Sequence, residues 1–377
     1  MIYIGMFFLS YVFMKIYERK KGNSYIRFVC LAVALFLPSL LAGLRADSIG
    51  TDVLVYAKSV YCTVASFSNF GDFFNFWSFN SVTSDPFYFL LTFLLAKTFS
   101  DYHFGLFVYQ LLIEILFFMG SRRVSEKYKF SISLLILWIH LCLYNVGLNA
   151  IRQMIAVSML FYFSTFLMDN KIKQFVIGWI FVIFWHSSAL LGVVILGVYV
   201  VSYNKKGILT QKQSITRCVL FISAILLIIV MMQPMTSILV NYGFLRGNYL
   251  NYLSGGIYQS AGLPRSVLIA PFIYLSTIFL RFKNMRKNYE LAIFFLLCAI
   301  CNFAFSFGAA ISTSLLRITF YFIPFVMVGI MMAIVTKKKN CRFWLSIITI
   351  ILLIFGYIDF VVKGYNETYP YEFYWSV

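Results

Sequence analysis

Long apolar stretches recur from one end of the chain to the other, and short polar loops separate them. A helix needs roughly 20 apolar residues to cross the hydrocarbon core of a bilayer, and most of these stretches reach that length. The pattern therefore predicts an all-α, polytopic transmembrane bundle. We expect helices near residues 1–17, 26–44, 104–120, 131–148, 149–168, 172–185, 187–202, 217–240, 265–282, 289–311, 316–336 and 342–362.

Two stretches depart from the usual length. Residues 172–203 are too short for two ordinary spans but have basic loops on both sides, so the chain must enter and return there, with its turn at Trp185–Ser188. The stretch Pro86–Ala96 is also short, and we interpret it as a re-entrant or interfacial helix in a long outer loop over residues 45–103. Residues 1–17 lack a basic leader and a small-residue cleavage site, so we expect a retained helix.

The composition agrees with a lipid environment. Hydrophobic residues make up 62% of the 377 residues and charged residues only 12%, which is too little polar surface for a water-soluble globule. We therefore predict one integral membrane domain over residues 1–377. Seven cysteines, Cys298 and Cys301 among them, lie mostly in apolar stretches, and we interpret them as packing residues without a disulfide, metal or redox role.

The net charge of +18 indicates topology rather than nucleic-acid binding. Of the 31 Lys and Arg residues, 23 fall in six clusters, which are cytoplasmic loops by the positive-inside rule. With these loops inside, the chain makes about twelve crossings and has both termini outside. The clusters are Lys15–Arg27, Arg122–Lys129, Lys171–Lys173, Lys205–Arg217, Arg281–Lys287 and Lys337–Arg342.

The remaining cations all fall on the outer side in this topology, together with most of the carboxylates and His186. Ionisable groups at helix ends in lipid are costly and usually serve a cavity. The sequence therefore predicts one polar site that faces the exterior. Its candidates are the cations Arg45, Lys58, Lys97, Arg152, Arg246, Arg265, Arg317 and Lys363 and the carboxylates Asp47, Asp52, Asp72, Asp85, Asp101, Glu367 and Glu372.

Arg152 lies at the outer start of a predicted helix, three residues after Asn149 and on the same helical face. A planar guanidinium at a helix N-terminus is suited to hold a phosphate or diphosphate through two hydrogen bonds. An arginine at this depth can equally anchor its helix at the lipid headgroups. The same two interpretations apply to Arg317, near the outer end of its helix, and both stay open on these residues alone.

His186 caps the broken hairpin, where irregular backbone is tolerated beside a water-filled cavity. It is a candidate general base or hydroxyl-binding group, and a structural role is equally open. After the Gly50 turn, Thr51 is a candidate helix N-cap and Asp52 lies in the first turn. Asp52 or Asp47 is also a candidate to deprotonate an attacking hydroxyl or to orient a substrate sugar.

The other membrane-embedded polar residues are assigned structural roles. Glu114 lies inside a predicted span without an obvious cationic partner, and we expect it to be neutral or hydrogen-bonded to another helix rather than catalytic. His103 and His140 carry no pattern. The chain has no Walker lysine motif, H-E-x-x-H motif or dinucleotide fingerprint, so we predict neither a cofactor nor a metal.

Four blocks of sequence resemble the EpsG family, which are Wzy-like polymerases of bacterial exopolysaccharide, capsule and O-antigen assembly. The blocks match in order and spacing over most of the chain, and the most specific part is R-Q-x-x-A at Arg152 followed 34 residues later by H-S at His186. They are R-x-D-x-I-G-T-D-x-x-x-Y at Arg45–Tyr56, N-A-I-R-Q-M-I-A at Asn149–Ala156, W-H-S-S-A at Trp185–Ala189, and Arg317 before Pro324.

The resemblance implies a glycosyltransferase at the outer face of the bacterial cytoplasmic membrane. Such an enzyme transfers a growing glycan from undecaprenyl diphosphate to the terminal sugar of the next lipid-linked repeat unit. Its partners would be undecaprenyl-diphosphate-linked oligosaccharides, the bilayer, and a flippase and chain-length regulator of the same pathway. We expect catalysis by Asp52 and His186, a lid over residues 241–264, an outer tail over 363–377, and substrate contacts from Arg45, Asp47, Asn149, Arg152, Gln153, Arg265 and Arg317.

Two other classes of protein share the hydropathy and the substrate. A polysaccharide flippase or exporter predicts cations along a central pathway and a repeat of halves, whereas the polar residues here crowd one side. An outer-face glycan ligase or acyltransferase needs much the same arginines and a similar base, so it stays open.

Overall fold

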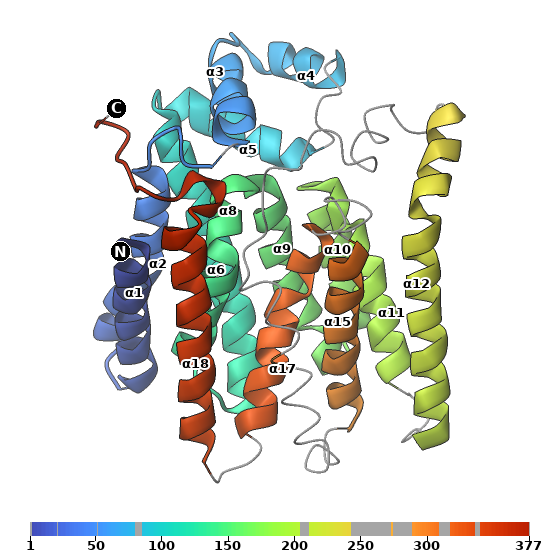
Figure 1. The fold of residues 1–377 in the computed structure, drawn as a ribbon. Coiled ribbons are helices and arrows are strands. Elements are labelled where there is room, and N and C mark those ends of the chain that lie inside the picture. Colours follow the sequence, from blue (N-terminus) through green and yellow to red (C-terminus); the bar gives the residue numbers. More distant parts are fainter. Residues whose placement is uncertain are drawn as a thin grey trace. The chain divides into compact units, whose positions relative to one another are not determined.

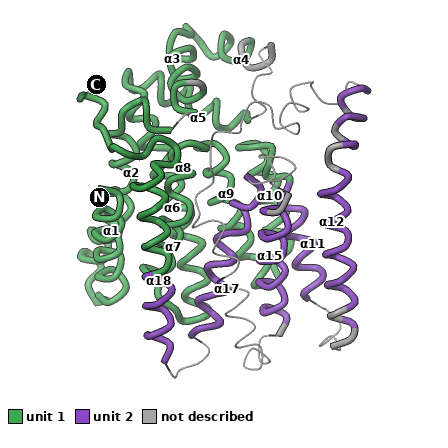
Figure 2. The backbone as a smooth tube through the Cα atoms, viewed as in Figure 1, with its two compact units in different colours: residues 1–190, 351–377 green, residues 191–350 purple. Residues whose placement is uncertain are grey.

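The computed structural model describes residues 2–20, 22–50, 52–79, 85–203, 211–242, 273, 289–308, 317–335 and 340–376. Across these ranges the regular structure is helical, with one isolated antiparallel bridge and no named strand. The chain divides into a first unit, residues 1–190 with 351–377, and a second unit, residues 191–350 (Figure 2). The all-α class is thus confirmed for the described residues, while a single domain over the whole chain stays a prediction.

The first unit is a helical bundle in which α2 packs on α1 and α6, α9 packs on α6 and α10, and α7 packs on α1 (Figure 1). Most of its helices agree with the predicted segments within a few residues, but α6 runs to Tyr128 and so includes most of the basic cluster Arg122–Lys129 that was predicted as a loop. They are α1 (Ile2–Arg19), α2 (Ser24–Gly43), α6 (Tyr102–Tyr128), α7 (Ile132–Ile139), the π-helix η2 (His140–Tyr144), α8 (Asn145–Asn149), α9 (Ile151–Ser164), the 3-10 turn η3 (Leu167–Asp169) and α10 (Ile172–Ile183).

A proline in the apolar interior of α2 shows how the bundle satisfies its backbone. Pro38 has no N–H, so the carbonyl of Ala34 loses its usual partner four residues later. Ser10 of α1, which is buried, donates its hydroxyl to that carbonyl at 2.8 Å. Because lipid offers no replacement hydrogen bond, this contact fixes α1 against α2.

The predicted outer loop is largely helical, and its helices lie at the same end of the first unit as the C-terminus (Figure 1). It contains the π-helix η1 (Val53–Lys58), α3 (Ser59–Ala65), α4 (Phe70–Phe79) and α5 (Pro86–Thr98). With 13 residues, α5 is about 20 Å long and too short to cross a bilayer core of roughly 30 Å. The prediction of a short helix at this position is confirmed.

The second unit contains α15, which packs on α11, α12 and α17. The predicted helix at 265–282 lies outside the described residues except for Ile273, and so does the predicted lid beyond residue 242. The elements are α11 (Gly192–Ser202), which follows the 3-10 turn η4 (Ser187–Leu191), α12 (Gln211–Asn241), α15 (Tyr289–Gly308), η6 (Thr319–Tyr321), α17 (Ile323–Val335) and the start of α18 (Cys341–Tyr357).

Among the described residues, five helices are long and apolar enough to cross a membrane. Several others, α5 and α10 among them, are apolar but shorter. The total of about twelve crossings therefore stays a prediction. The five candidate spans are Ser24–Gly43, Tyr102–Tyr128, Ile132–Asn149, Ile151–Asp169 and Cys341–Val362.

Three distant segments of the first unit meet at Gly50. Its N–H donates to the Asn366 carbonyl at 2.9 Å, and its φ of +91° is a conformation that glycine adopts readily. A Cβ at this position would lie 2.6 Å from the carbonyl oxygen of Leu148 in α8. The turn therefore needs a glycine both for its backbone angle and for its approach to α8.

We expect Gly50→Ala to destabilise the protein by about 1–3 kcal/mol, because the new methyl group meets backbone and the backbone angle becomes strained. Thermal unfolding of the purified protein measures this loss. Gly5→Ala in α1 is the matched control, since nothing lies within 4 Å of a Cβ added there. Equal unfolding temperatures for the two variants would contradict the proposed role of Gly50.

Candidate functional site

A buried carboxylate joins the two residues that the sequence singled out most strongly. Asp85 is 2% exposed, and its Oδ2 lies 3.0 Å from Nη1 of Arg152 and 2.9 Å from Nδ1 of His186. Its Oδ1 accepts a hydrogen bond from the Ser187 N–H at 3.3 Å. We call Arg152, Asp85 and His186 the polar cluster. It brings together residues that are 67 and 101 positions apart in the chain.

Contacts at the start of α5 place Asp85 next to His186. Asp85 precedes α5 and makes no side-chain cap to that helix, so its carboxylate is directed to other segments. The N–H of Phe87 in the first turn of α5 donates to the Phe184 carbonyl at 3.1 Å. This bond holds the start of α5 against the turn after α10, where His186 lies. Because α10 ends at Ile183 and η4 begins at Ser187, the helix is broken at the predicted turn, while the return of the chain through the membrane stays a prediction.

Arg152 lies between aromatic rings. Its guanidinium carbon is 5.0 Å from the ring centroid of Tyr56 in η1 and 5.8 Å from that of Tyr88 in α5. Its side chain is 20% exposed. A headgroup anchor would extend freely towards solvent, whereas this guanidinium is oriented by a carboxylate and two rings. The contacts therefore favour a positioned cation over an anchor.

The contact between Asp85 and Nδ1 fixes the chemistry of His186. A carboxylate on Nδ1 favours the tautomer with the proton on that nitrogen, which leaves the lone pair on Nε2. The His186 side chain is 22% exposed. An imidazole held in this way can accept a proton at Nε2, with the developing positive charge stabilised by the carboxylate behind it.

The pKa of Asp85 reflects two opposing effects. Burial by itself raises the pKa of this carboxyl group, but the hydrogen bond and charge of His186, the charge of Arg152 and the Ser187 N–H together outweigh it. The result is a pKa below the ordinary aspartate value. Asp85 is therefore ionised at neutral pH, and its negative charge is shared by two partners.

The sequence block Arg45–Tyr56 contributes to the cluster through its last residue, Tyr56, whose ring lies against Arg152. Asp52, a predicted catalytic residue, lies four positions earlier, and its N–H donates to Oδ1 of Asn149 at 2.7 Å. Nδ2 of Asn149 donates to Oδ1 of Asn366 at 3.1 Å. These contacts give Asn149 a structural role in aligning η1 with the start of α9, while catalysis by Asp52 stays a prediction.

Three other residues of the first unit are predicted to contact substrate. Arg45 is 2% exposed, and burial lowers the pKa of its guanidinium, partly offset by the phenols of Tyr144, Tyr3 and Tyr371. Asp47 forms an ion pair with Lys58 at 2.5 Å. Gln153 is buried at the start of α9, next to Arg152.

Two predicted diphosphate ligands belong to the second unit. Arg317 is half-buried just before η6, and Arg265 lies outside the described residues. Their roles stay predictions. In the parts of the chain that the structure describes, no group of three or more His, Cys, Asp or Glu side chains is placed to hold a metal ion.

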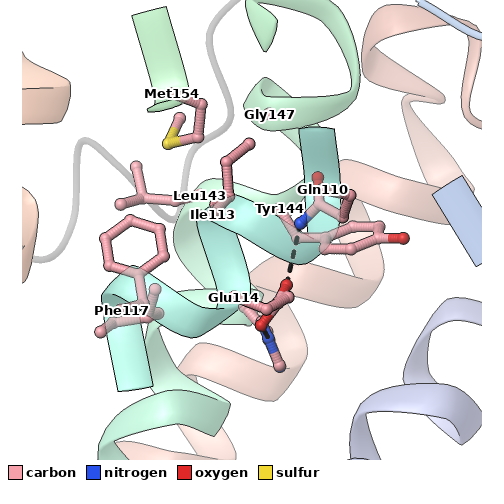
Figure 3. A pocket seen from close by; sticks show the side chains of 10 residues that line it. Gln110, Ile113, Glu114, Phe117, Leu143, Tyr144, Gly147 and Met154 are labelled. Atoms are coloured by element: carbon pink, nitrogen blue, oxygen red, sulfur yellow. Dashed lines mark hydrogen bonds and ion pairs between the residues drawn. The ribbon is translucent and has the colours of Figure 1, made fainter. Parts of the chain in front are cut away.

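A second buried polar group lies inside the bundle (Figure 3). Glu114 of α6 accepts a hydrogen bond from Gln110 at 2.8 Å and lies 2.7 Å from Nε2 of His140. The expected hydrogen bond to another helix is confirmed, and His140 is the partner that the sequence did not reveal. A cavity of about 10 Å³ adjoins this group, which is room for about one water molecule. We assign it to bracing the π-helix η2 against α6.

The sequence missed the central residue of the site. In the sequence Asp85 is one of seven candidate outer carboxylates, and no pattern marks Tyr88. The local pattern Asp85–Pro86 resembles an ordinary helix start, so it does not identify a carboxylate that bonds to residues elsewhere in the chain. Tyr56 was visible as the last letter of its block, but its stacking on Arg152 depends on the tertiary structure.

Comparison with known proteins gives one match. No curated protein and no solved structure matches the chain. The model of the EpsG family matches residues 27–373, nearly the whole length. Membership supports a membrane protein with a polymerase-type role in polysaccharide biosynthesis. The chain therefore belongs to the EpsG family, a Wzy-like polymerase family.

Proposed function

We propose that this chain polymerises lipid-linked oligosaccharide repeat units at the outer face of the bacterial cytoplasmic membrane, with the polar cluster as its reacting site. The observation that carries the proposal is the shared Oδ2 of Asp85, which holds a cation and an imidazole together. A transfer from a lipid diphosphate to a sugar hydroxyl needs these two groups: a base for the hydroxyl and a cation for the leaving diphosphate.

The reaction uses each member of the cluster at a stated atom. Nε2 of His186 takes the proton of the acceptor hydroxyl, whose oxygen bonds to the anomeric carbon of the donor sugar. The bond from that carbon to the diphosphate oxygen breaks, and undecaprenyl diphosphate leaves with the electron pair. Arg152 stabilises the charge that develops on the diphosphate.

Charge balance supports this assignment. The proposed reaction starts from the neutral form of His186, so that one positive Arg152 and one negative Asp85 give the cluster a net charge of zero. When His186 takes the proton, the net charge becomes positive at the moment when negative charge grows on the diphosphate. Asp85 then interacts more strongly with the imidazolium, and the Arg152 guanidinium becomes more available to the phosphate.

The length and the two ends of α6 support the proposed orientation of the site. This helix has 27 residues and is therefore about 40 Å long, enough to cross a bilayer. Its first residue, Tyr102, lies beside Lys58 of the predicted outer loop, which we call the outer segment. Arg123 and Lys127 near the other end of α6 pair with Asp169 at 2.7 Å. The basic cluster that marks the cytoplasmic side thus lies at the opposite end of α6 from the outer segment.

Arg152→Ala should remove polymerisation, because loss of one preorganised cationic donor costs about 10²–10³ in rate. Arg152→Lys should recover little, since an ammonium lacks the planar two-point geometry. The length distribution of surface polysaccharide in cells measures this, with membrane abundance checked. Arg122→Ala, which removes an exposed arginine from the other end of α6, should keep long chains. Long chains in Arg152→Ala would refute the role of Arg152, and long chains in a deletion strain would refute the proposed function.

Asp85→Asn should reduce transfer by about 10²-fold or more, because His186 loses its orienting carboxylate. Since the pKa of Asp85 is lowered in the folded protein, its contribution to stability is complete above the ordinary value of about 3.9 and is lost as pH falls below it. Thermal unfolding should therefore show the variant less stable than wild type at every pH from 7 to about 5. Asp72→Asn, which removes a carboxylate that caps its own helix, is the control. A difference that vanishes between pH 7 and 5 would contradict the assignment.

Cys62 provides a direct test of orientation, because it is an exposed free thiol on α3 and the other described cysteines are buried or half-buried. A membrane-impermeant maleimide should label the wild-type protein in intact spheroplasts, and Cys62→Ser should abolish this labelling. A cysteine introduced at Lys129, beyond the far end of α6, should react only after the membrane is permeabilised. The reverse pattern would place the cluster on the cytoplasmic side.

A further inference from the structure

The end of the chain is fixed against the start of the outer segment. Arg45 and Phe373 form an antiparallel bridge, and the N–H of Tyr374 donates to the Leu44 carbonyl at 3.0 Å. The hydroxyl of Tyr371 reaches the Leu41 carbonyl at 2.8 Å. These contacts attach the backbone of residues 371–375 to residues 41–45, so the aromatic side chains of this segment have defined positions.

The rings of this tail form a continuous stack. Trp375 lies parallel to Phe373, with ring centroids 4.7 Å apart and an angle of 14°, and contacts Tyr374 edge-on at 4.9 Å. Tyr374 in turn stacks on the imidazole of His103 at 4.2 Å. Trp375 remains 59% exposed and Tyr374 39% exposed. We call Trp375, Tyr374 and Phe373 the aromatic shelf.

Polar side chains continue the surface beyond His103. Nε2 of His103 lies 3.6 Å from Oδ1 of Asp47, and Oδ2 of Asp47 lies 2.5 Å from Nζ of Lys58. The Lys58 side chain is 42% exposed and the Asp47 side chain 28% exposed. An exposed apolar ring surface is thus followed by an accessible carboxylate and an accessible ammonium group.

We propose that the aromatic shelf, with Asp47 and Lys58, is a binding subsite for the sugar rings of the glycan, separate from the group that receives the diphosphate. A pyranose has an apolar face of C–H groups that packs on an aromatic ring and a rim of hydroxyls that bond to carboxylate and ammonium groups. The inference rests on the proposed function, because a polymerase must hold glycan while a new unit arrives.

The charges of the subsite favour a neutral polyol over a phosphate. Lys58 is already paired with Asp47, so this surface has little net positive charge to attract a lipid headgroup phosphate. In the polar cluster, by contrast, Arg152 becomes available as His186 gains a proton. Since Lys58 and Tyr56 both belong to η1, the same short helix contributes to the sugar subsite and to the cluster.

Binding experiments with two ligands distinguish the sugar subsite from the diphosphate site. Full-length protein in detergent is titrated calorimetrically with repeat-unit oligosaccharides, released by mild acid from the polysaccharide of the host strain, and with inorganic pyrophosphate. Trp375→Ala should raise the dissociation constant of the oligosaccharide by about tenfold and leave that of pyrophosphate unchanged. Arg152→Ala should raise the dissociation constant of pyrophosphate and leave that of the oligosaccharide unchanged.

Matched variants control for folding and for membrane anchoring. Trp375→Phe keeps a stacking ring and should bind the oligosaccharide within about threefold of wild type. Tyr25→Ala removes a highly exposed aromatic residue at the start of α2 and should have no effect. Equal oligosaccharide affinity in wild type and Trp375→Ala would overturn the subsite and leave the tail as a headgroup anchor. A different measurement tests the proposed function: long polysaccharide chains in the deletion strain would refute it.

Discussion

The buried charge of Asp85 is the constraint on which the candidate site depends. A carboxylate that is 2% exposed loses most of its hydration, and this loss is tolerated only when charged or hydrogen-bonding partners replace the water. The partners come from the start of α9 and from the turn after α10. Three chain segments are therefore required to meet at one carboxylate, and any alternative packing would leave a charge unpaired. The apolar bundle supplies the bulk of the burial, but it does not specify this meeting point.

Around this point the protein uses backbone contacts that tolerate little substitution. Gly50 brings the outer segment against α8, and Asn149 links the start of η1 to the tail through Asn366. These contacts fix the direction of η1, whose Tyr56 lies against Arg152. The block Arg45–Tyr56 thus combines a turn, a helix start and a ring that orients a cation.

The sequence predicted the elements better than the pairing between them. Apolar length and basic loops are local properties, so the helices and the break between helices near Trp185–Ser188 could be predicted. Arg152 and His186 were found because a cation and an imidazole at helix ends are unusual in lipid. Asp85 and the contact between Glu114 and His140 were not found, because each depends on which helices become neighbours. Asn149 bonds to Asp52 and Asn366, and no local pattern predicts these two contacts, while its contact with substrate stays a prediction.

The pairing of Arg152 has a consequence for how the proposed reaction gains speed. A diphosphate that binds before proton transfer competes with Asp85 for the guanidinium, so its gain in binding energy is small. Once His186 carries the proton, Asp85 has a second positive partner and the competition weakens. The stabilisation of the diphosphate therefore grows along the reaction coordinate, and interactions that are stronger in the transition state than in the bound substrate are the ones that raise the rate. A lone arginine in the same position would bind donor and leaving group alike and would contribute less to the chemical step.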